Sequence, residues 1–178
     1  GFTLAPTARV LDESKTRVLS SADNSIGWLA QSRYVPLAYL GDPEKTAATF
    51  PEIDGTRYAI AGDRARHRGD GSIELLGRES VCINSGGEKI FAEEVETILK
   101  TFPGISDAVV CGRPSKRWGQ EVCAVVSWNG VGTLDPLELV EHCRMHLAAF
   151  KAPRHIGEVP KVHRTPSGKA QYQWAIAV

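Results

Sequence analysis

Apolar residues after residue 90 recur with the period of a helix. In "AEEVETILKTF" they fall every three or four positions, so that they share one helical face. This face consists of Val95, Ile98, Leu99 and Phe102. The sequence therefore predicts an amphipathic helix that ends before the Pro103-Gly104 pair.

A second helix is predicted by "LDPLELVEHCRMHLAAF". Asp135 is a typical N-cap, Pro136 suits the first helical position, and Glu138 completes a variant of the capping box. The apolar face consists of Leu139, Val140, Cys143 and Leu147.

Continuous apolar runs separate these helices. "DAVVCG" and "EVCAVVSW" have strand length and no alternation, which is typical of strands covered on both faces. The prolines of "KAPRHIGEVPKV" favour an extended segment. Residues 80–178 are thus predicted to form a compact α+β unit.

The pattern before Arg78 is different. "ARVLDESKTRVL", "IGWLA" and "VPLAYLGD" predict short strands, and "TRYAIAGDRARHR" and "SIELLGR" predict two more, joined by a turn at "RGDG". Asp42-Pro43 predicts the start of a short helix in "DPEKTAATF". We expect residues 1–78 to be mostly β and too thin to form a core alone.

Composition narrows the function classes. The chain has 178 residues, of which 42% are hydrophobic and 24% charged, and its 21 Lys and Arg balance its 21 Asp and Glu. A net charge of zero gives no reason to expect nucleic acid as a partner. We expect no transmembrane segment and no signal peptide. The four cysteines form no C-x-x-C pair and are expected to be free thiols, mostly buried, in a reducing cytoplasm.

Three short segments could carry chemistry. The paired glycines of "INSGGEKI" suit either a hairpin turn or a phosphate, although the spacing fits neither the P-loop nor the dinucleotide fingerprint. In "AGDRA", Asp63 could accept hydrogen bonds from a ribose diol or cap a turn. In "TPSGK", Pro166 and Gly168 predict a tight turn that presents Lys169, either as a surface residue or toward a ligand.

Two other patterns favour structural interpretations. The "RGD" tripeptide lies within a predicted hairpin turn, which argues against an adhesion function. His142 and His146 have metal-ligand spacing, but the glutamate of H-E-x-x-H is missing, so we expect a packed or solvated pair and no metal site.

The order of these segments resembles one family. "RYAIAGDRARHRGDGSIELLGRESVCINSGGEKIFAEEVETIL", "DAVVCGRPSKRWGQEVCAVV", "HLAAFKAPRHI" and "VHRTPSGK" resemble the C-terminal part of the acyl-CoA synthetases of the adenylate-forming superfamily. The resemblance covers essentially the whole chain. It implies a small C-terminal lid domain similar to an α/β sandwich (80–178), preceded by the last, mostly β segment of a large N-terminal domain (1–79).

The resemblance also implies residue roles. Asp63 would bind the ribose hydroxyls of ATP, and Arg78 would contact the nucleotide near the ribose and phosphates. Lys169 would be the catalytic lysine that reaches the substrate carboxylate and the α-phosphate. The loop of Gly86, Gly87, Glu88 and Lys89 would enter the site for the thioester step, and Ser80 would be the hinge.

Two positions depart from the family pattern. The hinge residue is commonly Asp or Lys in the family, and here it is Ser80. The tyrosine that precedes the aspartate of "GD" is commonly four residues ahead of it, whereas Tyr58 lies five ahead of Asp63, with Ala61 in place of a threonine. The role of Tyr58 is left open.

The implied activity is that of a fatty-acid–CoA ligase that uses ATP, Mg²⁺ and CoA. The family's phosphate loop, adenine-binding segment and acyl pocket are missing from the sequence, so we expect a fragment that is inactive without its large domain. The alternatives are a ligase that delivers the acyl group to a carrier protein and a non-catalytic binding module. We expect a cytoplasmic protein, and peripheral contact with a membrane is left open.

Overall fold

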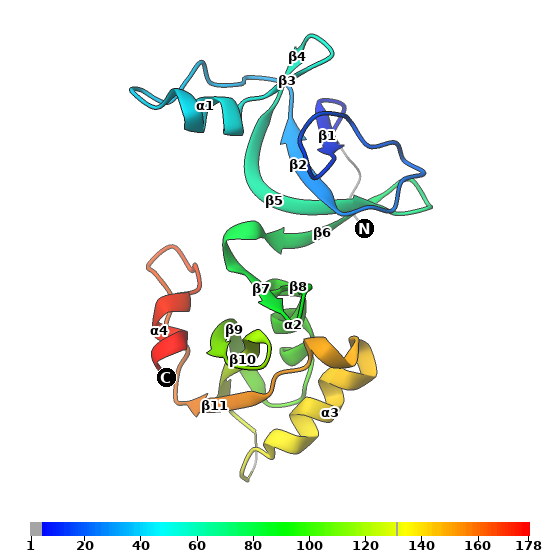
Figure 1. Ribbon diagram of the computed structural model, residues 1–178. Helices are drawn as coiled ribbons and strands as arrows, with labels where there is room; N and C mark the ends of the chain where they lie inside the picture. Colours follow the sequence, from blue (N-terminus) through cyan, green and yellow to red (C-terminus); the bar gives the residue numbers. More distant parts are fainter. Residues whose placement is uncertain (1–4, 131) are drawn as a thin grey trace. The chain divides into compact units, whose positions relative to one another are not determined.

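The computed structural model describes residues 5–130 and 132–178, and the chain divides into two compact units (Figure 1). Unit 1 ends at Ser80 and unit 2 begins at Val81, so that the boundary directly follows the predicted hinge residue. Each unit is described separately below.

Unit 1 is built on a four-stranded antiparallel sheet with the strand order β1-β2-β5-β6. Its strands are β1 (Ala8–Leu11), β2 (Gly27–Gln31), β5 (Ala59–His67) and β6 (Ile73–Arg78). A two-stranded ladder of β3 (Glu52–Ile53) and β4 (Thr56–Arg57) follows α1 (Pro43–Thr49). The predicted start of α1 is confirmed, because the Asp42 carboxylate accepts a hydrogen bond from the Lys45 amide at 2.9 Å.

Two expectations for unit 1 are wrong. Residues 35–42 form no strand: Pro36 lacks an N–H, and Arg57 Nη2 donates to the carbonyls of Pro36 and Leu37, at 3.1 and 3.0 Å. Leu37 and Leu40 are consequently exposed. Unit 1 also has cores of its own, since two small clusters are buried within it. They consist of Leu11, Ala30, Ile53, Tyr58 and Ile60, and of Val10, Leu19, Ala65 and Ile73.

Unit 2 contains a five-stranded sheet with the order β11-β10-β7-β8, in which β9 also pairs with β10. Its strands are β7 (Cys82–Ser85), β8 (Glu88–Phe91), β9 (Ile105–Ser115), β10 (Gly119–Trp128) and β11 (His155–Val159). Only β11 pairs in parallel, and its partner is β10. The helices are α2 (Ala92–Leu99), α3 (Pro136–His146) and α4 (Tyr172–Ala177), and a short 3₁₀ turn spans Ala149–Lys151. Another 3₁₀ turn, Glu79–Val81, includes the boundary between the units.

Helices cover both faces of β9 and β10, which explains their continuous apolar runs. Ala108, Val110, Val122, Ala124 and Val126 pack in one cluster with residues of α2 and α3, namely Val95, Leu99, Leu139 and Cys143. The intervening residues Val109, Cys111, Cys123 and Val125 pack in another cluster with Ala175 of α4. The predicted α+β organisation of unit 2 is confirmed.

The two longer helices begin as the sequence predicts and end earlier. Asp135 accepts a hydrogen bond from the Leu137 amide at 2.8 Å at the start of α3. The first helix, α2, ends at Leu99, and a turn carries the chain to Pro103. No helix in the described part of the chain is long and apolar enough to cross a membrane.

The four cysteines are free, as expected. Cys111, Cys123 and Cys143 are buried, and Cys82 is half-buried. Burial raises the pKa of Cys123 and of Cys143 to about 11, so that both thiols stay protonated at neutral pH. This argues against nucleophilic chemistry at these two positions.

Candidate functional site

Asp63 and Arg78 face each other across the β5–β6 pair of unit 1. Arg78 Nε donates to Asp63 Oδ1 at 3.1 Å, and both side chains retain contact with solvent. The preceding Gly62 has a φ of +94°, a conformation that favours glycine. Asp63 and Arg78, which the resemblance assigns to the nucleotide, are therefore brought together. A carboxylate and a guanidinium lie next to each other on the sheet of unit 1.

Arg64, next to Asp63, is a buried cation that the sequence analysis missed. Its guanidinium lies over the ring of Trp28, 4.1 Å from the centroid, and is 1% exposed. It pairs with Glu13, and its Nε lies 3.5 Å from Glu79 Oε2. A charged residue in a β-strand is usually expected to face solvent, and Trp28 and Glu13 lie far from Arg64 in sequence, so no local signal indicates this cluster.

Tyr58 belongs to the core of unit 1. It lies between β4 and β5, is buried, and packs in the cluster that contains Leu11 and Ile60. The buried side chain contributes to packing at this position.

The paired glycines form the hairpin turn between β7 and β8. Gly86 and Gly87 have φ values of +61° and +90°, as a type I′ turn requires at its two central positions. The Gly86 amide donates to the Trp118 carbonyl at 2.8 Å, which ties the turn to the β9–β10 connection. Glu88 and Lys89 follow at the exposed start of β8.

Lys169 lies on a tight turn before α4, as predicted. Gly168 has a φ of +81°, and its amide donates to the Thr165 carbonyl at 2.8 Å. The Lys169 carbonyl accepts from the Thr165 amide at 2.8 Å, and the Lys169 amide donates to Thr165 Oγ1 at 3.0 Å. The backbone of Lys169 is thus held on both sides, and its side chain is exposed.

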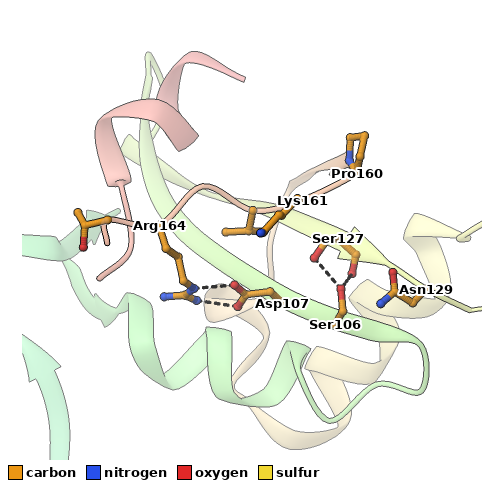
Figure 2. A pocket seen from close by; sticks show the side chains of 9 residues that line it. Ser106, Asp107, Ser127, Asn129, Pro160, Lys161 and Arg164 are labelled. Atoms are coloured by element: carbon orange, nitrogen blue, oxygen red, sulfur yellow. Dashed lines mark hydrogen bonds and ion pairs between the residues drawn. The ribbon is translucent and has the colours of Figure 1, made fainter. Parts of the chain in front are cut away.

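A surface pocket of about 530 Å³ lies beside this turn (Figure 2). Most of its lining residues are polar, including Asp107 and Arg164, and they come from β9, from the end of β10 and from the segment before the turn. Arg164 Nε and Nη2 donate to the two Asp107 carboxylate oxygens, each at 2.6 Å. These hydrogen bonds hold the pKa of Asp107 below its ordinary value.

Of the two histidines of α3, His142 is half-buried and His146 is exposed. His142 Nε2 lies 2.9 Å from the Thr101 hydroxyl, and its ring meets the edge of Phe102. His146 Nδ1 lies 2.9 Å from the His142 carbonyl. Among the described residues, no three His, Cys, Asp or Glu side chains are grouped so that they could hold a metal ion.

Comparison with known proteins assigns the class. Residues 94–169 match the family described as the AMP-binding enzyme C-terminal domain. The amide bond synthetase McbA from Marinactinospora thermotolerans is similar in structure, with a TM-score of 0.81 and 26% identity over 97% of this chain and 34% of that one. ATP-bound MatB from Rhodopseudomonas palustris has a TM-score of 0.78 and 28% identity over 94% of this chain and 32% of that one. The predicted class, the adenylate-forming enzymes, and the α+β fold are confirmed.

Within this class, the sequence relatives are acyl-CoA ligases. The medium-chain acyl-CoA ligase Mig of Mycobacterium avium is 55% identical over 98% of this chain and 32% of its own length. A medium/long-chain-fatty-acid–CoA/3-oxocholest-4-en-26-oate–CoA ligase of Mycolicibacterium smegmatis is 46% identical over 94% of this chain and 32% of its own length. The chain is thus similar to the C-terminal part of these acyl-CoA ligases, and it spans about a third of their length.

Proposed function

We propose that this chain is the lid portion, with the last segment of the large domain, of an AMP-forming fatty-acid–CoA ligase. The observation that carries the proposal is the 55% identity with a medium-chain acyl-CoA ligase over 98% of the chain. The exposed Lys169 on a fixed turn supports it. The acyl group would be a medium-chain or long-chain fatty acid, as in the names of the relatives.

In the first step, a carboxylate oxygen of the fatty acid attacks the α-phosphorus of ATP. A new O–P bond forms, the bond to the bridging oxygen breaks, and pyrophosphate leaves with the electron pair. Both reactants are anions, so a cation between them stabilises the transition state. We assign this role to Lys169, whose flexible stem lets a point charge follow the change in geometry.

In the second step, the thiol of CoA attacks the acyl carbon, its proton passes to solvent, and AMP leaves. The thiol needs the space in which the lysine acted, so the lid rotates about Ser80 and removes Lys169. The turn of Gly86 and Gly87, followed by Glu88 and Lys89, takes its place in this proposal. Exposed glycines allow close approach of the backbone to a ligand.

Asp63 and Arg78 would hold the nucleotide. A carboxylate can accept two hydrogen bonds from the ribose diol, and a guanidinium can donate to the ribose or phosphates. Their 3.1 Å contact places both charges at one site of unit 1.

The remaining requirements are also proposals. ATP and CoA would bind largely to the large domain of the whole protein, and that domain is the partner of this chain. Mg²⁺ would bind together with ATP, and we assign no step to it here. A cytoplasmic location stays a prediction, and peripheral contact with a membrane stays open.

The experiment is pyrophosphate release by the full-length protein with a series of fatty acids, in the presence and absence of CoA. The proposal expects release that requires a fatty acid, and acyl-CoA as the product when CoA is present. Acyl-AMP that forms without any later acyl-CoA would favour delivery to a carrier protein or another acceptor. That alternative has one observation in its favour, because McbA is named an amide bond synthetase. No pyrophosphate release with any acid would favour a non-catalytic module.

A further inference from the structure

Arg164 connects the turn of Lys169 to the central sheet of unit 2 (Figure 2). Its Nη1 donates at 3.1 Å to the carbonyl of Gly168, the residue directly before Lys169. Its Nε and Nη2 donate in parallel to Asp107 Oδ2 and Oδ1, each at 2.6 Å. One planar guanidinium therefore binds the turn on one side and a carboxylate on the other.

Asp107 provides a rigid anchor for this bridge. It lies within β9, opposite Ser127 of β10, and its Oδ1 also accepts from the Ala108 amide at 2.8 Å. The next residue, Ala108, is fully buried in the main core. These contacts limit the movement of the Asp107 carboxylate. Its two short hydrogen bonds to Arg164 limit the movement of the guanidinium in turn.

The arginine cannot be replaced by another cation without loss. Three of its nitrogens are used on partners that lie in different directions, Asp107 and the Gly168 carbonyl. A lysine would keep the charge, but its single ammonium group cannot reproduce the planar fork. The pair is only partly exposed, with 30% of the Arg164 side chain and 25% of the Asp107 side chain accessible.

We propose that Arg164 and Asp107 are positioning residues for the proposed catalytic Lys169, because they fix the turn that presents it during adenylation. The inference rests on the proposed function. Neither residue needs to touch a reacting atom. A misplacement of about 1 Å near the chemistry can cost roughly a hundredfold in rate. We therefore expect Arg164→Lys and Asp107→Asn to lower the rate of adenylation by about 10-fold to 100-fold.

The test measures the two half-reactions of the full-length protein separately. Adenylation is followed as fatty-acid-dependent pyrophosphate release in a single turnover, and thioester formation is started from preformed acyl-AMP and CoA. We expect Arg164→Lys and Asp107→Asn to slow the first and leave the second within about threefold, since Lys169 acts only in the first. Arg144→Lys is the matched control, because Arg144 pairs with Glu141 on the exposed side of α3.

A second comparison separates positioning from general stability. If Arg164 acts through Lys169, then Arg164→Lys has no further effect on adenylation in a Lys169→Ala background, whereas independent effects would multiply. Multiplying effects, or equal losses in both half-reactions, would overturn the inference. A normal adenylation rate for both single variants, with Lys169→Ala still defective, would overturn this inference alone. A normal rate for Lys169→Ala would instead overturn the assignment of the catalytic lysine.

Discussion

At the scale of single residues, Glu96 is an acid that the fold buries. It lies on α2, is 5% exposed, and its Oε1 accepts from the Val110 amide of β9 at 2.9 Å. Burial raises the pKa of this carboxyl group, so the charged form destabilises the folded state at neutral pH. The full cost of burying the charge lowers the free energy of unfolding at any pH above the pKa of Glu96 in the folded state. This cost disappears as the pH falls to the pKa of a glutamate in the unfolded chain, about 4.3.

We therefore expect Glu96→Gln to stabilise unit 2 at pH 7, because the amide oxygen can still accept from Val110 without a charge. The gain should shrink between pH 7 and pH 4. Denaturant titration followed by tryptophan fluorescence would measure it, since Trp118, Trp128 and Trp174 all lie in unit 2. A loss of stability at pH 7 would show that the carboxylate is needed at this position.

Asp63 offers a second test at the residue scale. Asp63→Asn keeps the shape and removes the charge that would face the ribose diol. Hydrogen bonds to charged groups contribute about 1.5–3 kcal/mol, so we expect the KM for ATP to rise at least about tenfold, with the KM for the fatty acid unchanged. Asp70→Asn is the control, because Asp70 lies in the β5–β6 turn, where its carboxylate accepts from the Ser72 amide and hydroxyl at 2.9 and 2.6 Å. Equal effects of the two variants would contradict the nucleotide role.

At the scale of elements, the β7–β8 turn distinguishes its two glycines. Both have a positive φ, which costs an alanine about 1 kcal/mol. A Cβ on Gly86 would also lie 2.9 Å from Trp118 Cε3, whereas a Cβ on Gly87 meets no atom within 4 Å. A substitution at either position therefore strains the backbone, but only one at Gly86 also brings the new Cβ too close to a neighbouring side chain.

We expect Gly86→Ala to destabilise unit 2 by clearly more than the roughly 1 kcal/mol of Gly87→Ala. The same variant should slow thioester formation more than adenylation in the full-length protein. Thermal unfolding and the two half-reactions would measure these effects. Identical unfolding curves for the two variants would mean that Trp118 moves aside without cost.

The elements differ in how far the sequence predicts them. β9, β10, α2 and α3 follow from long apolar patterns and from Asp135 and Pro136. α4 was missed, because six residues are too few to show a helical period. The strand predicted for residues 35–42 is wrong, because an apolar run does not show whether a partner strand exists.

Contacts between distant residues account for the rest. The turn of Lys169 follows from Pro166 and Gly168, but its anchor Asp107 is 57 residues from Arg164 in sequence. The buried Arg64 likewise depends on Glu13, 51 residues away. Such pairs are set by tertiary packing, and no local pattern of residues indicates them.

At the scale of the whole molecule, the chain separates the proposed ribose-binding pair from the proposed catalytic lysine. Asp63 and Arg78 lie in unit 1, and Lys169 and the glycine turn lie in unit 2. The boundary between Ser80 and Val81 places the two groups in separate compact units. This division suits an enzyme that uses the lysine in one step and removes it for the next.

The central claim is that Lys169 acts in adenylation and leaves before thioester formation. The most direct measurement compares Lys169→Ala with the unaltered full-length protein in the two half-reactions. Loss of a preorganised charge at the transition state costs about 100-fold to 1,000-fold. The account predicts a loss of this size in fatty-acid-dependent pyrophosphate release, and thioester formation from preformed acyl-AMP within about threefold of normal. Equal losses in both half-reactions, or none in the first, would contradict it.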